Sequence, residues 1–300
     1  MWAIRSGAGW EVHAPAKLNL LFEILARRED GYHEIETLMV PISVYDTLYL
    51  RRDSNGEIQL TCQWAAAAEA QAGRLGDLPT DRSNLAVKAV ELLRARAGIE
   101  AGATMRLVKR IPSAAGLGGG SSDAAAALMA ANLAWGLHWS VADLSTLAGE
   151  LGSDVPFFLT PGAAICRGRG ERVEPLARAA PLHVVVVRPP AGLSTAEVFR
   201  ACQVADRPHT TGPLRAALES GNAAQVARLL HNRLQEPAER LSPWVVRVRQ
   251  AFETLDCLGH QMSGSGTSYF GICRHARHAL RVASYLRARA LGSVFAARSC

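Results

Sequence analysis

The first hundred residues alternate between short apolar runs and turn-forming residues. Runs of alternating or continuous apolar residues predict strands, and they lie at Val12–Ala14, Leu18–Leu25 and Thr47–Arg51. Asp30-Gly31 predicts a turn between the second and third of these strands. Residues 64–82 hold four successive alanines, two glycines and a proline, which predicts a loop.

The helical period appears next. Leu85, Ala89 and Leu92 fall on one face of a predicted helix, which Ser83 would cap and Gly98 would end. A strand is predicted at Thr104–Arg110. The segment 111–123 is then rich in glycine and leads into an alanine-rich helix that ends near Gly136. That helix is apolar nearly all round, which predicts that it is buried. Ser140 and Asp143 have the spacing of a capping box and predict the start of a further helix.

The second half of the chain has a different rhythm. Leu182–Val187 is an apolar run typical of a central strand. Further helices are predicted near 195–202, 222–233, 243–254 and 275–289, and strands near 260–263, 268–273 and 294–297. This β-α-β-β-α-β order predicts a ferredoxin-like unit and an α+β fold. The Gly-, Pro- and Arg-rich stretch 161–181 predicts a division into domains at 1–170 and 171–300.

Composition narrows the class of protein. Apolar residues make up 49% of the 300 residues and charged residues 20%, which allows a sizeable core and excludes wholesale disorder. The net charge is +6, and thirty arginines stand against three lysines, Lys17, Lys88 and Lys109. A nucleic-acid-binding protein is one reading of so many arginines, but they are dispersed rather than clustered in a stripe. A retained lysine indicates a place where a compact ammonium fits and a guanidinium does not; the alternative is chance.

The six cysteines show no C-x-x-C and no paired spacing, which argues against a zinc site and a disulfide framework. The first residues lack the charged and apolar regions of a signal peptide. No run reaches the roughly 18 apolar residues of a membrane span. Together these features predict a protein of the cytoplasm, with no membrane partner and no resident metal.

The strongest chemical signal is the loop at 111–123. Its four glycines, at positions 116, 118, 119 and 120, allow successive backbone N–H groups to point into one concavity that binds anions. The loop feeds a helix N-terminus, which also favours phosphate. Ser121 and Ser122 add hydroxyls, and Ser122 is a candidate ligand for a magnesium ion carried by a nucleotide. The alternative is a flexible turn before a buried helix, and the loop is neither a Walker nor a Rossmann motif.

Two charged residues interrupt apolar segments. Asp154 stands before Val155-Pro156-Phe157-Phe158, and Lys17 lies inside an otherwise apolar strand. A lysine beside a partly desolvated carboxylate would keep it ionised and lower the pKa of a hydroxyl held between them. For Asp154 the alternative is a turn-forming residue that binds its own backbone. A second small-residue segment, Met262–Thr267, would allow a close backbone approach to a substrate or to the phosphate loop, or would be a simple hairpin turn.

Three of these motifs occur together in one known family. Ala14–Leu20, Pro112–Ala125 and Ser263–Thr267, in this order and at these separations, resemble the GHMP kinase superfamily. That resemblance implies an ATP-binding N-terminal domain like domain 2 of ribosomal protein S5 and a ferredoxin-like, substrate-binding C-terminal domain. The long form of the glycine loop and Asp30–Glu34 resemble the members that phosphorylate the 2-hydroxyl of a cytidine diphosphate-linked methylerythritol in the non-mevalonate isoprenoid pathway.

The resemblance also implies roles for single residues. Asp154 matches the catalytic base and Lys17 its partner lysine. Substrate-binding positions match Asn19, Tyr32, His33 and Phe199, with the Tyr-His pair near the cytosine; helical core packing is the alternative for Phe199. ATP, with its Mg²⁺, is implied to bind Pro112, Ala115, Gly116, Leu117, Gly118, Gly119, Gly120, Ser121 and Ser122.

Two departures from the family pattern stand out. Asp123 replaces an asparagine of some relatives, and a carboxylate near phosphates would repel them unless it points away or faces the metal. The alanine-rich insert at 64–79 lies near where relatives hold adenine. Two other readings of function remain beside the main one. One is a sibling such as a homoserine or mevalonate-type kinase. The other is a member that has lost catalysis and binds ligands as a sensor.

Overall fold

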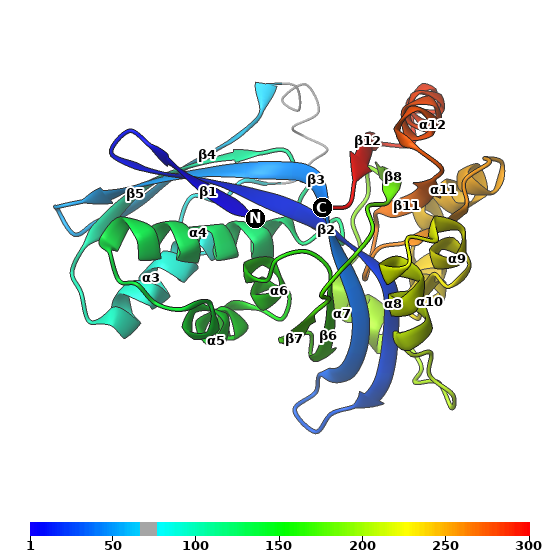
Figure 1. Cartoon of the computed structure of the whole chain (residues 1–300), viewed down its shortest axis with the longest axis horizontal. Coiled ribbons are helices and arrows are strands. Elements are labelled where there is room, and N and C mark those ends of the chain that lie inside the picture. Colours follow the sequence, from blue (N-terminus) through cyan, green and yellow to red (C-terminus); the bar gives the residue numbers. More distant parts are fainter. Residues whose placement is uncertain (67–76) are drawn as a thin grey trace. The chain divides into compact units, whose positions relative to one another are not determined.

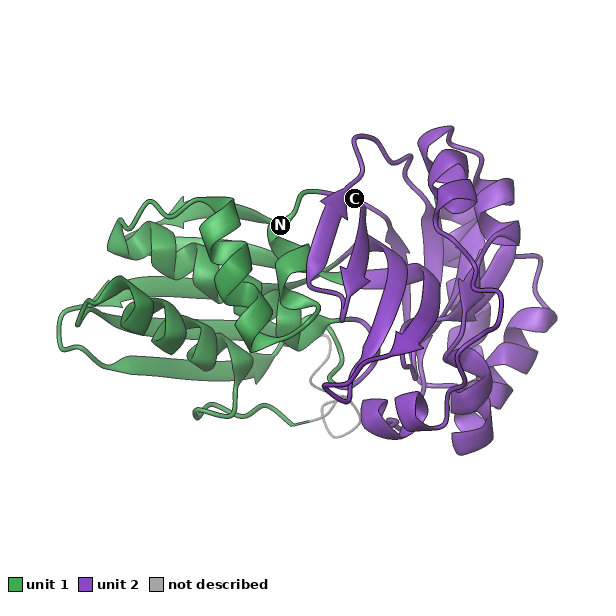
Figure 2. Ribbon diagram, turned by 90° about the horizontal axis from the view of Figure 1, so that it is seen from below, with its two compact units in different colours: residues 1–16, 44–113, 118–161 green, residues 17–43, 114–117, 162–300 purple. Residues whose placement is uncertain are grey.

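The computed structural model describes residues 1–66 and 77–300, and these form two compact units. Unit 1 contains residues 1–16, 44–113 and 118–161, and unit 2 contains residues 17–43, 114–117 and 162–300 (Figure 2). Each unit is thus assembled from segments that are separate along the chain.

Unit 1 is built on antiparallel and parallel strand pairs of one sheet. Strand β1 (Trp2–Ser6) pairs antiparallel with the start of β2 (Gly9–Arg27). The end of β3 (His33–Asp53) pairs antiparallel with β5 (Gly102–Lys109), and β5 pairs parallel with β4 (Ile58–Trp64). In this sheet the strand order is β1-β2-β3-β5-β4.

Four helices of unit 1 pack together beside these strands (Figure 1): α3 (Leu85–Ala97), α4 (Gly119–Trp135), α5 (Val141–Leu151) and α6 (Val155–Leu159). Helix α4 contacts each of the other three. Its alanines between positions 124 and 131 are all buried, as the sequence predicts, because small side chains let neighbouring helices approach closely. The predicted capping box of α5 is also confirmed: Ser140 and Asp143 bond reciprocally.

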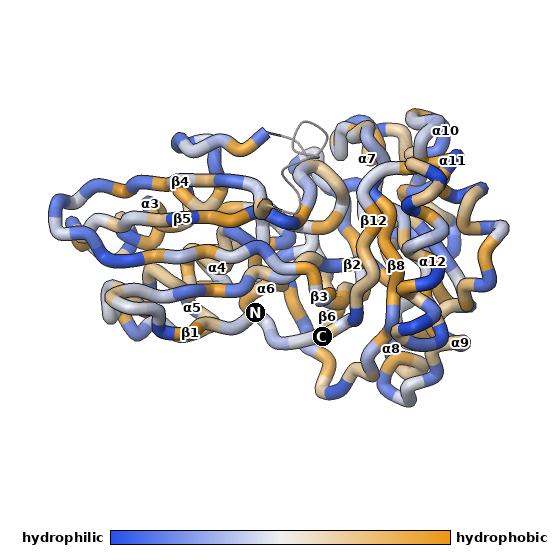
Figure 3. Tube along the Cα trace, turned by 90° about the horizontal axis from the view of Figure 1, so that it is seen from above, coloured by the Kyte–Doolittle hydropathy of each residue, from blue (hydrophilic) through white to orange (hydrophobic). Residues whose placement is uncertain are grey.

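Unit 2 contains a second sheet with the order β10-β11-β8-β12. These strands are all antiparallel and lie at Gly259–Met262, Tyr269–Cys273, His183–Arg188 and Ser293–Arg298, respectively. Strand β8 holds four successive valines between His183 and Arg188, and this stretch is orange in Figure 3. Helices α11 (Pro243–Glu253) and α12 (Ala276–Ala288) pack on the sheet. This arrangement confirms the predicted ferredoxin-like unit.

Smaller elements complete unit 2, and the sequence pattern did not predict most of them. Strand β6 (Ala164–Gly168) pairs with β3, and β7 (Arg172–Pro175) pairs with β6. Strand β9 (His231–Asn232) pairs parallel with β2. The remaining helices are α7 (Thr195–Arg200), α8 (Gly212–Glu219), α9 (Ala223–Arg228) and α10 (Gln235–Leu241).

Some predicted boundaries are wrong for local reasons. Asn84, not Ser83, caps α3: its side chain accepts from the N–H of Ala86 at 2.9 Å, while Ser83 bonds to Asp81. The helix predicted at 222–233 ends at Arg228, because the residues after it pair with β2 instead.

The single division predicted at residue 170 also differs from the structure. Strands β2 and β3 are 19 and 21 residues long, and each begins in one unit and ends in the other. Residues 17–43 therefore belong with the C-terminal half of the chain. A boundary inside a continuous strand leaves no glycine, proline or charge signal in the sequence.

Candidate functional site

The predicted phosphate loop leads directly into α4. The helix begins at Gly119, so the last two glycines and both serines belong to its first turn rather than to the loop before it. Its N-cap, Gly118, supplies no side-chain cap, and the first N–H groups of a helix have no acceptor within the helix. This end of α4 is thus a ready site for an anionic group. Of the other predicted binding residues, Pro112, Ala115 and Leu117 are buried.

Within unit 2, residues 114–117 of the phosphate loop contact the second glycine-containing segment, Met262–Thr267. Gly116 has a φ of +72°, and an added Cβ would lie 2.3 Å from the main-chain oxygen of Ser263. The Ser263 hydroxyl donates to the Gly116 oxygen at 3.1 Å, and the Ser268 N–H donates to the Ala115 oxygen at 3.1 Å. Met262–Thr267 therefore packs against the phosphate loop, which confirms the close-approach reading of this segment. Only glycine fits at position 116.

The chemistry of Ser122 fits a nucleotide-bound cation. Its side chain is buried in the first turn of α4, and its Oγ has no hydrogen-bond partner among the described residues. A buried hydroxyl without a partner carries a free-energy cost, which a ligand that binds there would remove. Hydroxyl oxygens are accepted ligands of Mg²⁺, which prefers oxygen donors and commonly bridges a protein and a phosphate. Ser121 beside it is half-buried.

Lys17 and Asn19 lie side by side on β2 within unit 2. Lys17 is 3% exposed, and its Nζ donates to Asn19 Oδ1 at 2.6 Å. The Asn19 amide donates to Thr37 Oγ1 at 2.8 Å, which fixes its orientation. An added Cβ on Gly264 would lie 3.1 Å from Asn19 Oδ1 and 3.3 Å from Lys17 Nζ. The turn of the second glycine segment thus closes over these two side chains.

Asp154 lies in unit 1, just before α6. It occupies the N-cap position of that short helix, yet its carboxylate makes no capping bond to the helix backbone. The residue is half-buried, as the apolar segment after it predicts. Its meeting with Lys17 stays a prediction.

The three aromatic residues predicted at the substrate end all belong to unit 2, and two of them are in contact. The rings of His33 and Phe199 lie 5.4 Å apart, and Phe199 also packs on Phe22 at 6.0 Å. Tyr32 is 53% exposed, with the Arg169 guanidinium 4.9 Å from its ring centroid. Burial, and next the nearby Arg27, lower the pKa of His33, so its imidazole is neutral at pH 7. Its Nε2 is buried without a hydrogen-bond partner among the described residues.

Two amide side chains bond the backbone around Asn19 and around Gly264, and neither was identified from the sequence. Gln261 donates to the main-chain oxygens of Asn19 and Leu20, at 2.8 and 3.0 Å. Asn232 donates to the oxygens of Met262 and Gly264, both at 2.8 Å. An amide within an apolar segment was the only available signal, because the partners lie up to 242 residues away along the chain.

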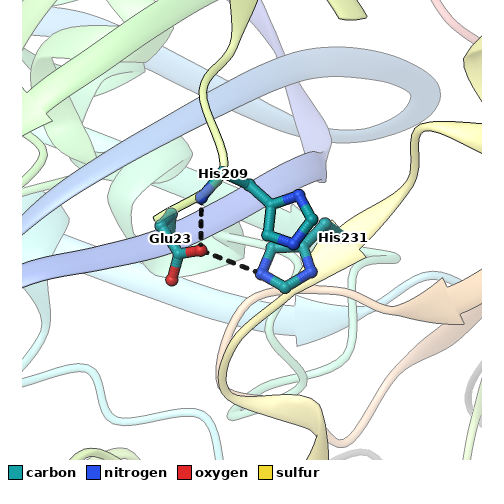
Figure 4. Close-up of side chains that lie close together, drawn as sticks. All are labelled: Glu23, His209 and His231. Carbon is teal, nitrogen blue, oxygen red and sulfur yellow. Dashed lines mark hydrogen bonds and ion pairs between the residues drawn. The ribbon is translucent and has the colours of Figure 1, made fainter. Parts of the chain in front are cut away.

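A buried carboxylate on β2 organises a further cluster, drawn in Figure 4. Glu23 Oε2 accepts the His209 N–H at 2.9 Å and lies 3.1 Å from His231 Nε2, while Arg233 binds both carboxylate oxygens at 2.7 and 2.9 Å. The donor set of two imidazoles and a carboxylate could hold a metal ion. The two rings are stacked at 3.9 Å, however, and the bidentate arginine fills the carboxylate. We therefore assign the cluster as an ion-pair network that holds the loop at His209 and the segment at β9 to β2.

The retained lysines fall into two groups. Lys17 and Lys109 are buried, whereas Lys88 is exposed. Lys109 binds Asp46 and Asp123 within unit 1. Asp123 thus pairs with a cation inside the protein, which resolves the repulsion that a carboxylate near phosphates would cause. The insert at 64–79, where adenine contacts were in question, lies largely outside the described residues.

Comparisons with known proteins identify the family of this chain. The family models named GHMP kinases N terminal domain and GHMP kinases C terminal match residues 84–162 and 214–291. A 4-diphosphocytidyl-2-C-methyl-D-erythritol kinase of Pelotomaculum thermopropionicum is 43% identical over 91% of this chain and 92% of its own length. The namesake of Rhodopirellula baltica is 41% identical over 91% of this chain and 89% of its own.

Solved structures give the same result. A crystal structure of 4-(cytidine 5'-diphospho)-2C-methyl-D-erythritol kinase, 37% identical, superposes with a TM-score of 0.79 over 96% of this chain and 98% of its own. A homoserine kinase from Cytophaga hutchinsonii superposes with a TM-score of 0.73 over 100% of this chain and 97% of its own; at 21% identity it shows the fold alone. No helix within 1–66 or 77–300 is long and apolar enough to cross a membrane. The chain belongs to the GHMP kinases and, among them, to the 4-diphosphocytidyl-2-C-methyl-D-erythritol kinase family.

Proposed function

We propose that this small-molecule kinase transfers the γ-phosphoryl group of ATP to the 2-hydroxyl of 4-diphosphocytidyl-2-C-methyl-D-erythritol, in the non-mevalonate pathway to isoprenoid precursors. The observation that carries the proposal is the identity of 35–43% to curated kinases of that name over about nine-tenths of the chain. The residues that match the family motifs agree with it, each within its own unit.

Nucleotide binding is assigned to the loop at 112–122. The uncapped N-terminus of α4 and the backbone N–H groups around Gly118 and Gly119 supply donors for the β- and γ-phosphates. Ser122 is the side chain that would hold Mg²⁺, because its hydroxyl is buried and has no partner among the described residues. When bound, the metal ion neutralises charge on the phosphates.

Acceptor binding is assigned to unit 2. Asn19 is held by Lys17 and Thr37, which leaves its position fixed on β2. Tyr32, His33 and Phe199 supply flat faces suited to the cytosine ring. Neutral His33, with its buried and unpartnered Nε2, is suited to a hydrogen bond with the neutral pyrimidine. A homoserine or a mevalonate would leave this aromatic group unused.

Proton transfer is assigned to Asp154, with Lys17 as its partner. As the acceptor oxygen bonds to the γ-phosphorus, Asp154 takes the hydroxyl proton and the bond to the β,γ-bridging oxygen breaks, so that ADP leaves with the electron pair. Lys17 donates to the charged groups around the reacting oxygen. Phosphoryl transfer demands little covalent chemistry of the protein, so positioning and charge neutralisation supply most of the acceleration.

The test is direct. The enzyme is incubated with ATP, Mg²⁺ and the cytidylyl methylerythritol, and the product is identified by mass as the singly phosphorylated acceptor. Homoserine and mevalonate serve as control acceptors and should remain unmodified. Phosphorylation of a control in preference to the cytidylyl compound would contradict the acceptor assignment. ATP turnover with no acceptor modified would favour the sensor reading instead.

The cellular setting is a further part of the proposal. We place the enzyme in the cytoplasm, in agreement with the thiols of Cys62, Cys202, Cys257 and Cys273, which are not joined in disulfide bonds. A fluorescent fusion that co-localises with a membrane or exported marker in the source cell would contradict this assignment.

A further inference from the structure

Three charged side chains form a buried cluster behind the phosphate loop, within unit 1. Lys109 ends β5, Asp46 lies on β3, and Asp123 lies near the start of α4. Their side chains are 5%, 0% and 5% exposed, respectively. The Lys109 ammonium donates to Asp46 Oδ2 and to Asp123 Oδ2 and so joins the two strands to the helix.

The second oxygen of Asp46 binds the backbone of the loop. Oδ1 accepts the N–H of Arg110 and, at 2.9 Å, the N–H of Ile111. These are the first residues after β5, where the chain enters the phosphate loop. One carboxylate therefore holds the entry of the loop and, through Lys109 and Asp123, also holds its exit into α4.

The entry of the loop, at Ile111, and its exit, at Gly119, are also closely packed against each other. An added Cβ on Gly119, the first residue of α4, would lie 2.9 Å from Ile111 Cγ2 and 3.4 Å from Lys109 Nζ. The chain thus leaves β5 and enters α4 at nearly the same place. The residues between them form a closed loop whose ends are fixed by charge and by shape.

This cluster is costly in free energy. Two carboxylates face one ammonium, and burial raises the pKa of Asp123 to about 7 against the opposing pull of Lys109. Burial would lower the pKa of Lys109, yet the two carboxylates outweigh it and raise that pKa. Buried ion pairs seldom add net stability over apolar residues of similar volume. A geometric role explains their presence better than a stabilising one.

We propose that Asp46, Lys109 and Asp123 are positioning residues that hold the two ends of the phosphate loop, so that its N–H groups are arranged for phosphate before the nucleotide binds. The inference rests on the proposed function only in assigning the loop to ATP. A prearranged loop avoids the ordering cost that binding otherwise carries. The network lies within unit 1 and bonds the backbone at the entry of the loop and a side chain at its exit.

Paired variants test this role. Asp123→Ala removes an acceptor of Lys109, whereas Asp123→Asn restores one without the charge. We expect Asp123→Ala to raise the KM for ATP by about tenfold and Asp123→Asn to return it to within about threefold of wild type. The KM for the acceptor should stay within about twofold in both variants. Asp46→Asn should raise the KM for ATP as Asp123→Ala does, because both oxygens of Asp46 accept hydrogen bonds and an asparagine keeps only one oxygen acceptor.

A probe without a base separates positioning from a contact to the nucleobase. Inorganic tripolyphosphate carries the phosphates of ATP alone, and its Kd is measured by titration calorimetry. We expect Asp123→Ala and Asp46→Asn to weaken the binding of tripolyphosphate by the same factor as the binding of ATP. A loss of affinity for ATP without a loss of affinity for tripolyphosphate would mean that the network acts on nucleobase binding. That result would overturn the proposal.

Asn132→Ala is the matched control. Asn132 is buried in the same helix, where it bonds both the N–H and the oxygen of Trp139 at 3.0 and 3.1 Å, far from the loop. The Asn132→Ala variant should have a lower Tm than wild type, and its affinities for ATP and for tripolyphosphate should be unchanged. Equal effects of Asn132→Ala and Asp123→Ala on KM would mean that helix stability, not loop position, is responsible. If the wild type bound both phosphate probes but left the cytidylyl acceptor unmodified, the proposed function would fail while the loop proposal stood.

Discussion

The side-chain amide of Asn232 donates to the main-chain oxygen of Gly264 at 2.8 Å, within unit 2. The same amide holds the Met262 oxygen at 2.8 Å, and its own oxygen accepts the Leu234 N–H at 3.0 Å. The amide nitrogen of Asn232 thus donates to two backbone oxygens, and its amide oxygen accepts from one backbone N–H. Through Gly264, this residue sets the turn that closes over Lys17 and Asn19.

Asn232→Ala should therefore affect both stability and acceptor turnover. Two main-chain oxygens would lose their donor, at a cost of about 2 kcal/mol in the free energy of unfolding. The displaced turn should lower kcat/KM for the acceptor by about tenfold. Thermal unfolding and steady-state kinetics measure the two effects. Asn222→Ala removes the cap of α9, where Asn222 accepts the Gln225 N–H, and should lower stability alone. Unchanged acceptor kinetics in Asn232→Ala would contradict the role of this turn.

Gly116 and Gly120 should respond oppositely to alanine. At position 116 the added Cβ meets the Ser263 oxygen at 2.3 Å and the backbone has a φ of +72°, so Gly116→Ala should lose about 3 kcal/mol of stability. At position 120, in the first turn of α4, the added Cβ would be 3.6 Å from Leu85 Cδ1, an ordinary contact. Gly120→Ala should leave Tm unchanged or raise it, because alanine favours helix. Denaturant unfolding of the two variants side by side decides the matter.

Asp154→Asn should leave the fold intact and nearly abolish turnover. Removing a base that acts only on the reacting hydroxyl should lower kcat by several orders of magnitude with little change in either KM. Asp143→Asn is a suitable control, since Asp143 belongs to the exposed capping box of α5 and should alter stability by about 1 kcal/mol at most. A kcat for Asp154→Asn within about tenfold of wild type would remove Asp154 from the role of base.

Glu23 makes the stability of unit 2 sensitive to acid. Burial alone would raise its pKa, but the bonds from His231, Arg233 and the backbone outweigh burial and leave the pKa well below its usual value. A carboxyl with a lowered pKa in the folded state contributes stability above its unfolded pKa of about 4.5, and this contribution is lost as the pH falls below that value.

Glu23→Gln should accordingly cost about 3 kcal/mol at pH 7, because Arg233 and His231 lose their counter-charge. The difference from wild type should shrink as the pH is lowered from 5 toward 3 (about 1.4 kcal/mol for each unit of pKa shift that is titrated away). Urea unfolding across this pH range provides the measurement. Glu174→Gln is the control: Glu174 forms ion pairs with Arg167 and Arg215 and is 48% exposed, so its effect should be small at every pH. A pH-independent difference for Glu23→Gln would contradict the assignment.

Local patterns in the sequence predicted most of the longer helices and strands. Helix α4, the capping box of α5 and strand β8 follow from side-chain size, spacing and hydropathy over a few residues. The glycine loop and the β-α-β-β-α-β order of elements in the C-terminal half were equally recognisable from the sequence. Short elements such as β9 and α6 were not, because two to five residues have no period of their own and form only through pairing or packing.

The site divides along the same line. The sequence by itself determined which residues are candidates for the chemistry: the glycines and serines of the loop, Lys17, Asp154 and the aromatic residues were proposed from residue type and from the resemblance to the GHMP kinases. Only the tertiary structure decided which partners Asn232, Gln261, Asp46 and Glu23 bind. Each of these four binds partners that lie tens to hundreds of residues away along the chain. A buried polar side chain must find its partner in space, and sequence patterning records burial and periodicity but not which distant atom satisfies a hydrogen bond.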